Sequence, residues 1–151
     1  MSLVIKQLKT QSGFTLVELI TVMVILGVLA ATALPRFFNR SSFDSRGLYD
    51  TAISTLRYAQ KVAVAQRRFV CVAYTANSIT LSIGATAACG TNLVDLNGQT
   101  PYTVSAPNGV TLSGGSNFNF DALGRASLAQ SVTVSGYNVP ITVEAETGYV
   151  H

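Results

Sequence analysis

The sequence contains few charges and almost none of the residues that most often act in catalysis. Charged residues make up 11% of its 151 residues, against about 25% in an ordinary soluble domain. The one histidine is His151, so the serines lack the base that a nucleophilic triad needs. Two cysteines without a neighbouring histidine do not supply the four ligands of a zinc site, and so few acids do not favour calcium. We therefore expect no enzymatic activity, no metal and no other cofactor.

Apolar residues make up 48% of the chain, which excludes intrinsic disorder, and they gather near the N-terminus. Residues 14–34 hold a single charge, Glu18. As a helix this run would span roughly 31 Å, which is about the thickness of the hydrocarbon core of a bilayer. Lys6 and Lys9 precede it without an acid, which favours a cytoplasmic N-terminus. Pro35 follows and is expected to end or kink the helix. The pattern predicts one membrane span, with residues 36–151 outside the cytoplasm.

The rest of the chain, residues 36–151, changes in charge and in hydrophobic pattern at Phe69. Residues 36–68 carry seven bases and two acids, whereas residues 69–151 carry one base and four acids. Apolar spacing in residues 45–68 predicts an amphipathic helix, and beyond it β-branched and aromatic runs alternate with turn residues. Strands are expected at residues 69–74, 79–84, 102–105, 110–112, 117–120, 132–135 and 139–145. The predicted fold class is α+β: a long N-terminal helix, transmembrane and then amphipathic, followed by an antiparallel β-rich globular head.

The N-terminal segment has two ordinary interpretations. A secretory signal would be cut after the A-x-A tripeptide at residues 31–33, but the apolar run is longer than the usual signal and carries a carboxylate. A plain signal anchor would make Glu18 incidental, although an ionisable residue inside a span is costly and is a functional candidate by default.

A third interpretation comes from resemblance. The string GFTLVE at residues 13–18, the short basic leader, the apolar run and Pro35 together resemble the cleavage and methylation motif of type IV prepilins and type II secretion pseudopilins. The resemblance implies that a prepilin peptidase cuts between Gly13 and Phe14 and methylates the new amine of Phe14. Glu18 would become the fifth residue of a mature chain 14–151. In such proteins it would pair with the terminal amine of a neighbouring subunit and set the register of assembly.

Further features resemble particular groups within this family. A helix continuing to Arg68, the strand that follows it and the pair Gly148–Tyr149 resemble the GspH/FimT-type minor pilins, and residues 34–39 look like pilins of the mannose-sensitive haemagglutinin (MSHA) system. The implied organisation is a cleaved leader at 1–13, a transmembrane or filament-core helix at 14–35, an amphipathic stalk at 36–68 and a β-rich head at 69–151.

The function implied is that of a minor pilin-like structural subunit of an MSHA-type type IV pilus, which initiates or joins filament assembly through its N-terminal helix. The implied partners are other pilin or pseudopilin subunits, the prepilin peptidase and the inner-membrane assembly machinery. The implied location is the bacterial inner membrane, in a single pass with a periplasmic head, and then the pilus or pseudopilus. The alternatives are a minor pseudopilin of type II secretion and a DNA-binding minor pilin in DNA uptake.

The predicted head and stalk offer further candidate sites. Cys71 and Cys89 would lie in an oxidising compartment, so we expect a disulfide. The bases of the stalk form either a solvated face, which would contact neighbouring stalks or acidic lipid, or a nucleic-acid track. The residues of that track would be Arg57, Lys61, Arg67 and Arg68.

Four charged residues of the predicted head are candidates for catalysis or binding. Asp121, Glu144 and Glu146 could pair as catalytic carboxylates but are expected to be solvated. Arg125 is expected on a turn, with a role in binding as the alternative.

Overall fold

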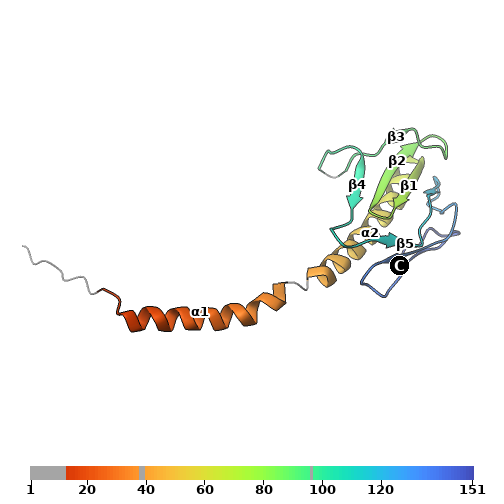
Figure 1. Cartoon of the computed structure of the whole chain (residues 1–151). Helices are drawn as coiled ribbons and strands as arrows, with labels where there is room; N and C mark the ends of the chain where they lie inside the picture. Colours follow the sequence, from red (N-terminus) through yellow and green to blue (C-terminus); the bar gives the residue numbers. More distant parts are fainter. Residues whose placement is uncertain (1–12, 38–39, 96) are drawn as a thin grey trace, which may run out of the picture. The chain divides into compact units, whose positions relative to one another are not determined.

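The computed structural model describes residues 13–37, 40–95 and 97–151, with the side chains of residues 32–40 outside the description. Apart from Gly13, the expected leader therefore lies outside the described residues. The chain divides into two compact units, residues 1–39 and 40–151, which are considered separately below. The first unit contains one helix, and the second contains a helix followed by eight strands. Figure 1 labels both helices and the first five strands.

Helix α1 (Leu16–Phe37) begins directly after Thr15. The Thr15 hydroxyl accepts a hydrogen bond from the backbone N–H of Glu18 at 3.2 Å, and the Thr15 carbonyl accepts one from the N–H of Leu19 at 3.1 Å. Thr15 is therefore the N-cap of the helix. The helix continues through Pro35, so this proline does not end it. Among the residues that the structure describes, no helix is long and apolar enough to cross a membrane.

Helix α2 (Arg40–Gln66) has one buried face, as the apolar spacing predicted. The side chains that line this face are fully buried or nearly so: Leu48, Ala52, Leu56, Ala59 and Ala63. Gly47 lies within the helix and does not interrupt it.

A Schellman motif ends α2 at its C-terminal end. The N–H of Arg68 donates to the carbonyl of Ala63 at 3.1 Å, and the N–H of Arg67 donates to the carbonyl of Val64 at 3.3 Å. Arg67 takes the left-handed conformation that this motif requires, with φ of 51°.

Two antiparallel sheets complete the second unit. The first contains β1 (Phe69–Thr75), β2 (Ser78–Gly84), β3 (Thr91–Asn92), β4 (Tyr102–Ser105) and β6 (Phe118–Phe120). Its order is β3-β2-β1-β6, and β4 also pairs with β2. The second contains β5 (Leu112–Ser113), β7 (Gln130–Val134) and β8 (Ile141–Val143), in the order β5-β7-β8. The predicted order of a helix followed by an antiparallel β-rich region is confirmed.

The core of the second unit lies between α2 and the inward faces of the two sheets. Alternate residues of β1 and β2 face it, and the register of the strands places Val70 opposite Ile83 and Val72 opposite Leu81. Phe120 from β6 and Ile141 from β8 are completely buried in the same cluster. Among the described side chains, every member of this core belongs to residues 40–151, so the second unit has the packing of an independently folding domain.

The predicted strands differ from the observed ones mainly at their ends. The run at 110–112 becomes β5, which begins only at its last residue, and the run at 139–145 contributes only Ile141–Val143. The short strand β3 was not predicted, because two exposed residues leave no apolar pattern.

Candidate functional site

Gly13 and Phe14 form an exposed junction before α1. A Cβ added to Gly13 would meet no atom within 4 Å, so the fold places no steric demand for glycine at this position. A missing side chain does allow another protein to approach the backbone closely. The side chain of Phe14 is 83% exposed. The junction is therefore accessible, as cleavage at this bond would require.

Glu18 lies in the first turn of α1, four residues after Phe14. The positive end of the helix dipole favours a carboxylate at this position. Thr15 and Glu18 have the S/T-x-x-E spacing of a capping box, and the structure contains its first half, the bond from the Glu18 N–H to the Thr15 hydroxyl. Thr15 was not predicted to be a cap, although its spacing to Glu18 was the signal that would have identified this role.

Helix α1 presents apolar side chains in every direction. Its large apolar residues between positions 16 and 29 are all at least 49% exposed, and they occupy almost every position: Leu16, Val17, Leu19, Ile20, Val22, Met23, Val24, Ile25, Leu26, Val28 and Leu29. A helix that is apolar all round is normally buried in a larger assembly or in lipid. Between residues 16 and 29, the helix therefore lacks a surface suited to water.

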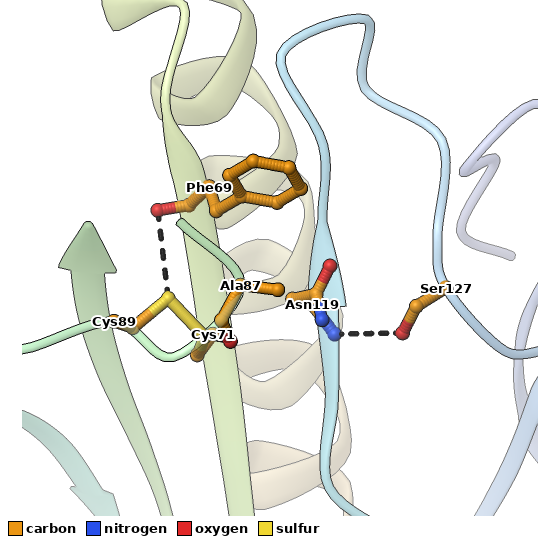
Figure 2. The surroundings of a disulfide bond; sticks show 6 residues. All are labelled: Phe69, Cys71, Ala87, Cys89, Asn119 and Ser127. Carbon is orange, nitrogen blue, oxygen red and sulfur yellow. Dashed lines mark hydrogen bonds between the residues drawn. A yellow bond between two sulfur atoms is a disulfide. The ribbon is translucent and has the colours of Figure 1, made fainter. Parts of the chain in front are cut away.

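The expected disulfide between Cys71 and Cys89 is present, with the two Cα atoms 6.0 Å apart. It joins β1 to the loop that follows β2, and Figure 2 shows the bond beside Phe69 and Asn119. The Sγ atom of Cys89 lies 3.6 Å from the Phe69 carbonyl oxygen, which is a contact and not a hydrogen bond, because a disulfide sulfur carries no proton. On the neighbouring strand, the backbone N–H of Asn119 donates to the Ser127 hydroxyl at 3.1 Å.

The four basic residues considered for nucleic-acid binding lie along α2 and in the turn that closes it, and two of them, Arg57 and Lys61, line one groove on the helix. Arg57 donates from Nε and Nη2 to the Val150 carbonyl, at 3.2 and 3.0 Å, and so attaches the C-terminal segment to α2. Lys61 is exposed on α2, whereas Arg67 and Arg68 lie in the turn that closes the helix.

The aromatic residues near these bases, Tyr58 and Phe69, are half-buried. Tyr58 stacks on Tyr102 of β4, with ring centroids 5.4 Å apart, and Phe69 is half-buried. Single-stranded nucleic acid is bound by exposed aromatic platforms interleaved with bases. This arrangement does not favour such a site.

Asp121, one of the three acids considered for catalysis, is paired with a base. Asp121 and Arg125 form an ion pair at 2.9 Å, and Asp121 Oδ1 also accepts from the N–H groups of Leu123 and Arg125. Burial alone would raise the pKa of Asp121, but these bonds from Arg125 and Leu123 lower it below its usual value. Glu144 and Glu146 are exposed. Within the described part of the chain, no group of three or more histidines, cysteines and acids is placed to hold a metal.

The ion pair lies at the edge of a shallow cleft of about 280 Å³ on the outer face of the head. Its polar and aromatic lining comes from Phe69, Asn119, Asp121, Arg125, Ser127 and Glu146. Arg125 therefore holds its own turn closed and also borders this cleft. Its role in binding stays a prediction.

Residues 8–34 match the prokaryotic N-terminal methylation motif. The chain is 38% identical over 56 residues to the type IV narrow pilus major component PilA5 of Thermus thermophilus. The match covers 37% of this chain and 48% of that protein. Two fimbrial proteins of Pseudomonas aeruginosa are each 29% identical over 98 residues, covering 65% of this chain and 62% of theirs. The chain is therefore similar in sequence to these pilus and fimbrial proteins.

The fold is similar to that of a solved minor pilin. It resembles the crystal structure of the type IV minor pilin FimU of Pseudomonas aeruginosa, with a TM-score of 0.54 and 15% identity over 74% of this chain and 90% of that one. A second crystal form of FimU gives a TM-score of 0.51. The chain therefore has the pilin fold. It spans 48% and 62% of the length of the curated relatives that it matches.

Proposed function

We propose that this chain is a minor pilin-like structural subunit of an MSHA-type type IV pilus, and that it initiates or joins filament assembly through α1. The observation that carries the proposal is the chemistry of α1, which is apolar on every side and has one carboxylate in its first turn. A surface of this kind requires either lipid or other helices around it.

Lipid and neighbouring helices would each bury the apolar surface of α1. Burial of each CH2 group is worth about 0.8 kcal/mol whether the surrounding atoms belong to lipid or to neighbouring helices, so hydrophobicity alone does not move the helix from a membrane into a filament. We therefore expect the subunit to wait in the bacterial inner membrane in a single pass, with its head in the periplasm. The inner-membrane assembly machinery would supply the energy that transfers it to the filament.

Glu18 would fix the axial position of the subunit relative to its neighbours in the filament. Cleavage after Gly13 would create an amine at Phe14, and a buried carboxylate is tolerated only when it is paired with a charge of opposite sign. In the filament, the Glu18 carboxylate of one subunit would pair with the Phe14 amine of a neighbouring subunit. Sliding of the helices would break the pair and leave two charges unpaired, so one axial position is favoured.

A pilus is favoured here over a type II secretion apparatus and over DNA uptake. The curated relatives and the FimU structures are named as pilus or fimbrial proteins, and Arg57, one of the four bases considered for nucleic acid, is bonded to the C-terminal segment. A head domain that shifted DNA in a salt-dependent manner would instead favour the uptake function.

The direct test is the mass of the chain extracted from membranes. We expect a chain that begins at Phe14 and is about 14 Da heavier than its unmodified form, because one methyl group replaces a hydrogen of the terminal amine. A chain that begins at Leu34, after the A-x-A tripeptide, would contradict processing by a prepilin peptidase.

A further inference from the structure

The head contains two asparagine–glycine pairs, Asn97–Gly98 and Asn108–Gly109, and all four residues are exposed. In such a pair the backbone nitrogen of the glycine can attack the side-chain amide of the asparagine, because the glycine has no side chain to hinder the approach. The two glycines have nearly the same φ, +81° and +83°, and a Cβ added to either would meet no atom within 4 Å. The pairs differ in the hydrogen bonds that their backbones form.

The first pair, Asn97–Gly98, lies in a hydrogen-bonded loop. The N–H of Gly98 donates to the carbonyl of Asp95 at 3.1 Å. Asp95 Oδ1 accepts from the N–H groups of Asn97 and Gln99, at 2.8 and 2.7 Å. The N–H of Asp95 in turn donates to the Gln99 carbonyl at 2.9 Å. The Gly98 nitrogen is therefore occupied, and the bonds on both sides of it fix the backbone.

The second pair, Asn108–Gly109, lies at the tip of a turn. The N–H of Val110 donates to the carbonyl of Pro107 at 3.0 Å, which closes a four-residue turn around the pair. Neither Asn108 nor Gly109 forms a hydrogen bond with any described residue, through its backbone or its side chain. The Gly109 nitrogen is therefore free to approach the side chain of Asn108.

We infer that Asn108 is a site of spontaneous deamidation and that its loop protects Asn97 from the same reaction. The Gly109 nitrogen gives up its proton and forms a bond to Cγ of Asn108, and the bond from Cγ to the amide nitrogen breaks. The leaving nitrogen takes up the proton and departs as ammonia, so that a cyclic succinimide remains. Water then adds to either carbonyl carbon of the ring and opens it, which yields aspartate or isoaspartate. Water is the co-reactant, and no electrons are transferred.

The modification adds a negative charge to the head near the start of α2. Pro107, the residue before Asn108, lines a groove of about 190 Å³ together with Phe43, Asp44 and Leu48 of α2. The new carboxylate would therefore lie close to a groove that already contains Asp44. Isoaspartate also adds a methylene group to the backbone of the turn. The inference does not depend on the proposed function, because the reaction requires only the folded head.

The test is incubation of the full chain, in detergent micelles, in water enriched in oxygen-18. Product formed during the incubation takes its new oxygen from this water, which distinguishes it from product formed earlier or during digestion in ordinary water. Chymotrypsin cleaves after Tyr102 and so places the two asparagines on different peptides, whose conversion is measured by mass spectrometry. The same chain unfolded in urea gives the rate of each site without the structure.

We expect Asn108 to react in the folded chain at about its rate in the unfolded chain. Asn97 should react at least about tenfold more slowly than in the unfolded chain, because each hydrogen bond that must open contributes a factor of roughly 2–10.

Two variants separate the effect of the hydrogen bonds from that of exposure. Asp95→Ala removes the side-chain acceptor of the Asn97 and Gln99 N–H groups, so it should raise the rate at Asn97 by about tenfold and leave the rate at Asn108 unchanged. Asn108→Gln should stop the conversion at position 108, because its longer side chain would have to form a larger ring.

Three results would overturn the inference. They are a rate at Asn97 equal to or above that at Asn108 in the folded parent, a rate at Asn108 at least about tenfold below that of the unfolded chain, and a rate at Asn97 that Asp95→Ala leaves unchanged. The proposed function is judged separately, by whether the chain is processed at Gly13 and enters filaments.

Discussion

Gly148 is the position where a small change should disturb the head most. It has a φ of +64°, and a Cβ added there would overlap the carbonyl oxygen of Gly124 and lie 2.6 Å from Gln60 Nε2. A left-handed conformation costs a non-glycine residue about 1–2 kcal/mol, and overpacking a well-packed site costs about 1–3 kcal/mol more. We therefore expect Gly148→Ala to lower the free energy of unfolding of the head by about 2–5 kcal/mol.

Gly109 provides the matched control. It also has a positive φ, +83°, but a Cβ added there would meet no atom within 4 Å. Gly109→Ala should therefore cost only the backbone part, about 1–2 kcal/mol. The assay is urea unfolding of residues 40–151, followed by far-ultraviolet circular dichroism with the disulfide intact. Equal losses in the two variants would refute the close approach of Gly148 to Gly124 and Gln60.

Three further changes test other parts of the account. Gly13→Val should leave the precursor uncut, because its side chain blocks the approach of the peptidase, and a processed variant seen by intact mass would contradict this. Alkylation without reductant should leave Cys71 and Cys89 unlabelled, and Cys71→Ser should lower the free energy of unfolding by about 3 kcal/mol; full labelling of the native protein would contradict the disulfide. The Thr55 hydroxyl is buried without a partner among the described residues, so Thr55→Val should raise the free energy of unfolding by about 1–3 kcal/mol. Thr51→Val, at an exposed hydroxyl bonded to the Gly47 carbonyl, is its control, and a Thr55 variant no more stable than this one would count against the buried, unpaired hydroxyl.

Periodicity was sufficient to predict the main elements of the head. The apolar spacing along α2 identified the buried face that includes Ala52 and Leu56, because a helix must place its apolar stripe on the core. The hairpin of β1 and β2 was also predicted, because two runs of β-branched and aromatic residues flank a short turn. The disulfide followed from the compartment expected for the head.

Contacts between distant segments could not be predicted from pattern. The bonds from Gln60 to the carbonyls of Gly124 and Thr147 join residues 64 and 87 positions apart, and no local rule relates them. The same holds for Arg57, which the sequence placed among possible phosphate ligands and the structure bonds to the Val150 carbonyl. Thr15 is a different case, because its spacing to Glu18 is local and the capping pattern was legible.

The central claim, that the chain assembles through α1 with Glu18 setting its register, is tested most directly by Glu18→Val. The variant should still be cut after Gly13 and should insert into the membrane at least as well as the parent, because it removes the one charge from residues 14–34. In the filament, however, the Phe14 amine of the adjoining subunit would be buried without a partner. Loss of one member of a buried pair costs about 3–5 kcal/mol, a factor of hundreds or more in an assembly equilibrium.

Thr21→Val is the control for a polar-to-apolar change in the same helix, because Thr21 lies one turn from Glu18 and its hydroxyl donates to the Glu18 carbonyl. The measurement is the ratio of each variant in sheared filaments to that in membranes. The account predicts that Thr21→Val enters filaments as the parent does, whereas Glu18→Val remains in the membrane fraction. Entry of Glu18→Val into filaments at the parent level would contradict the account.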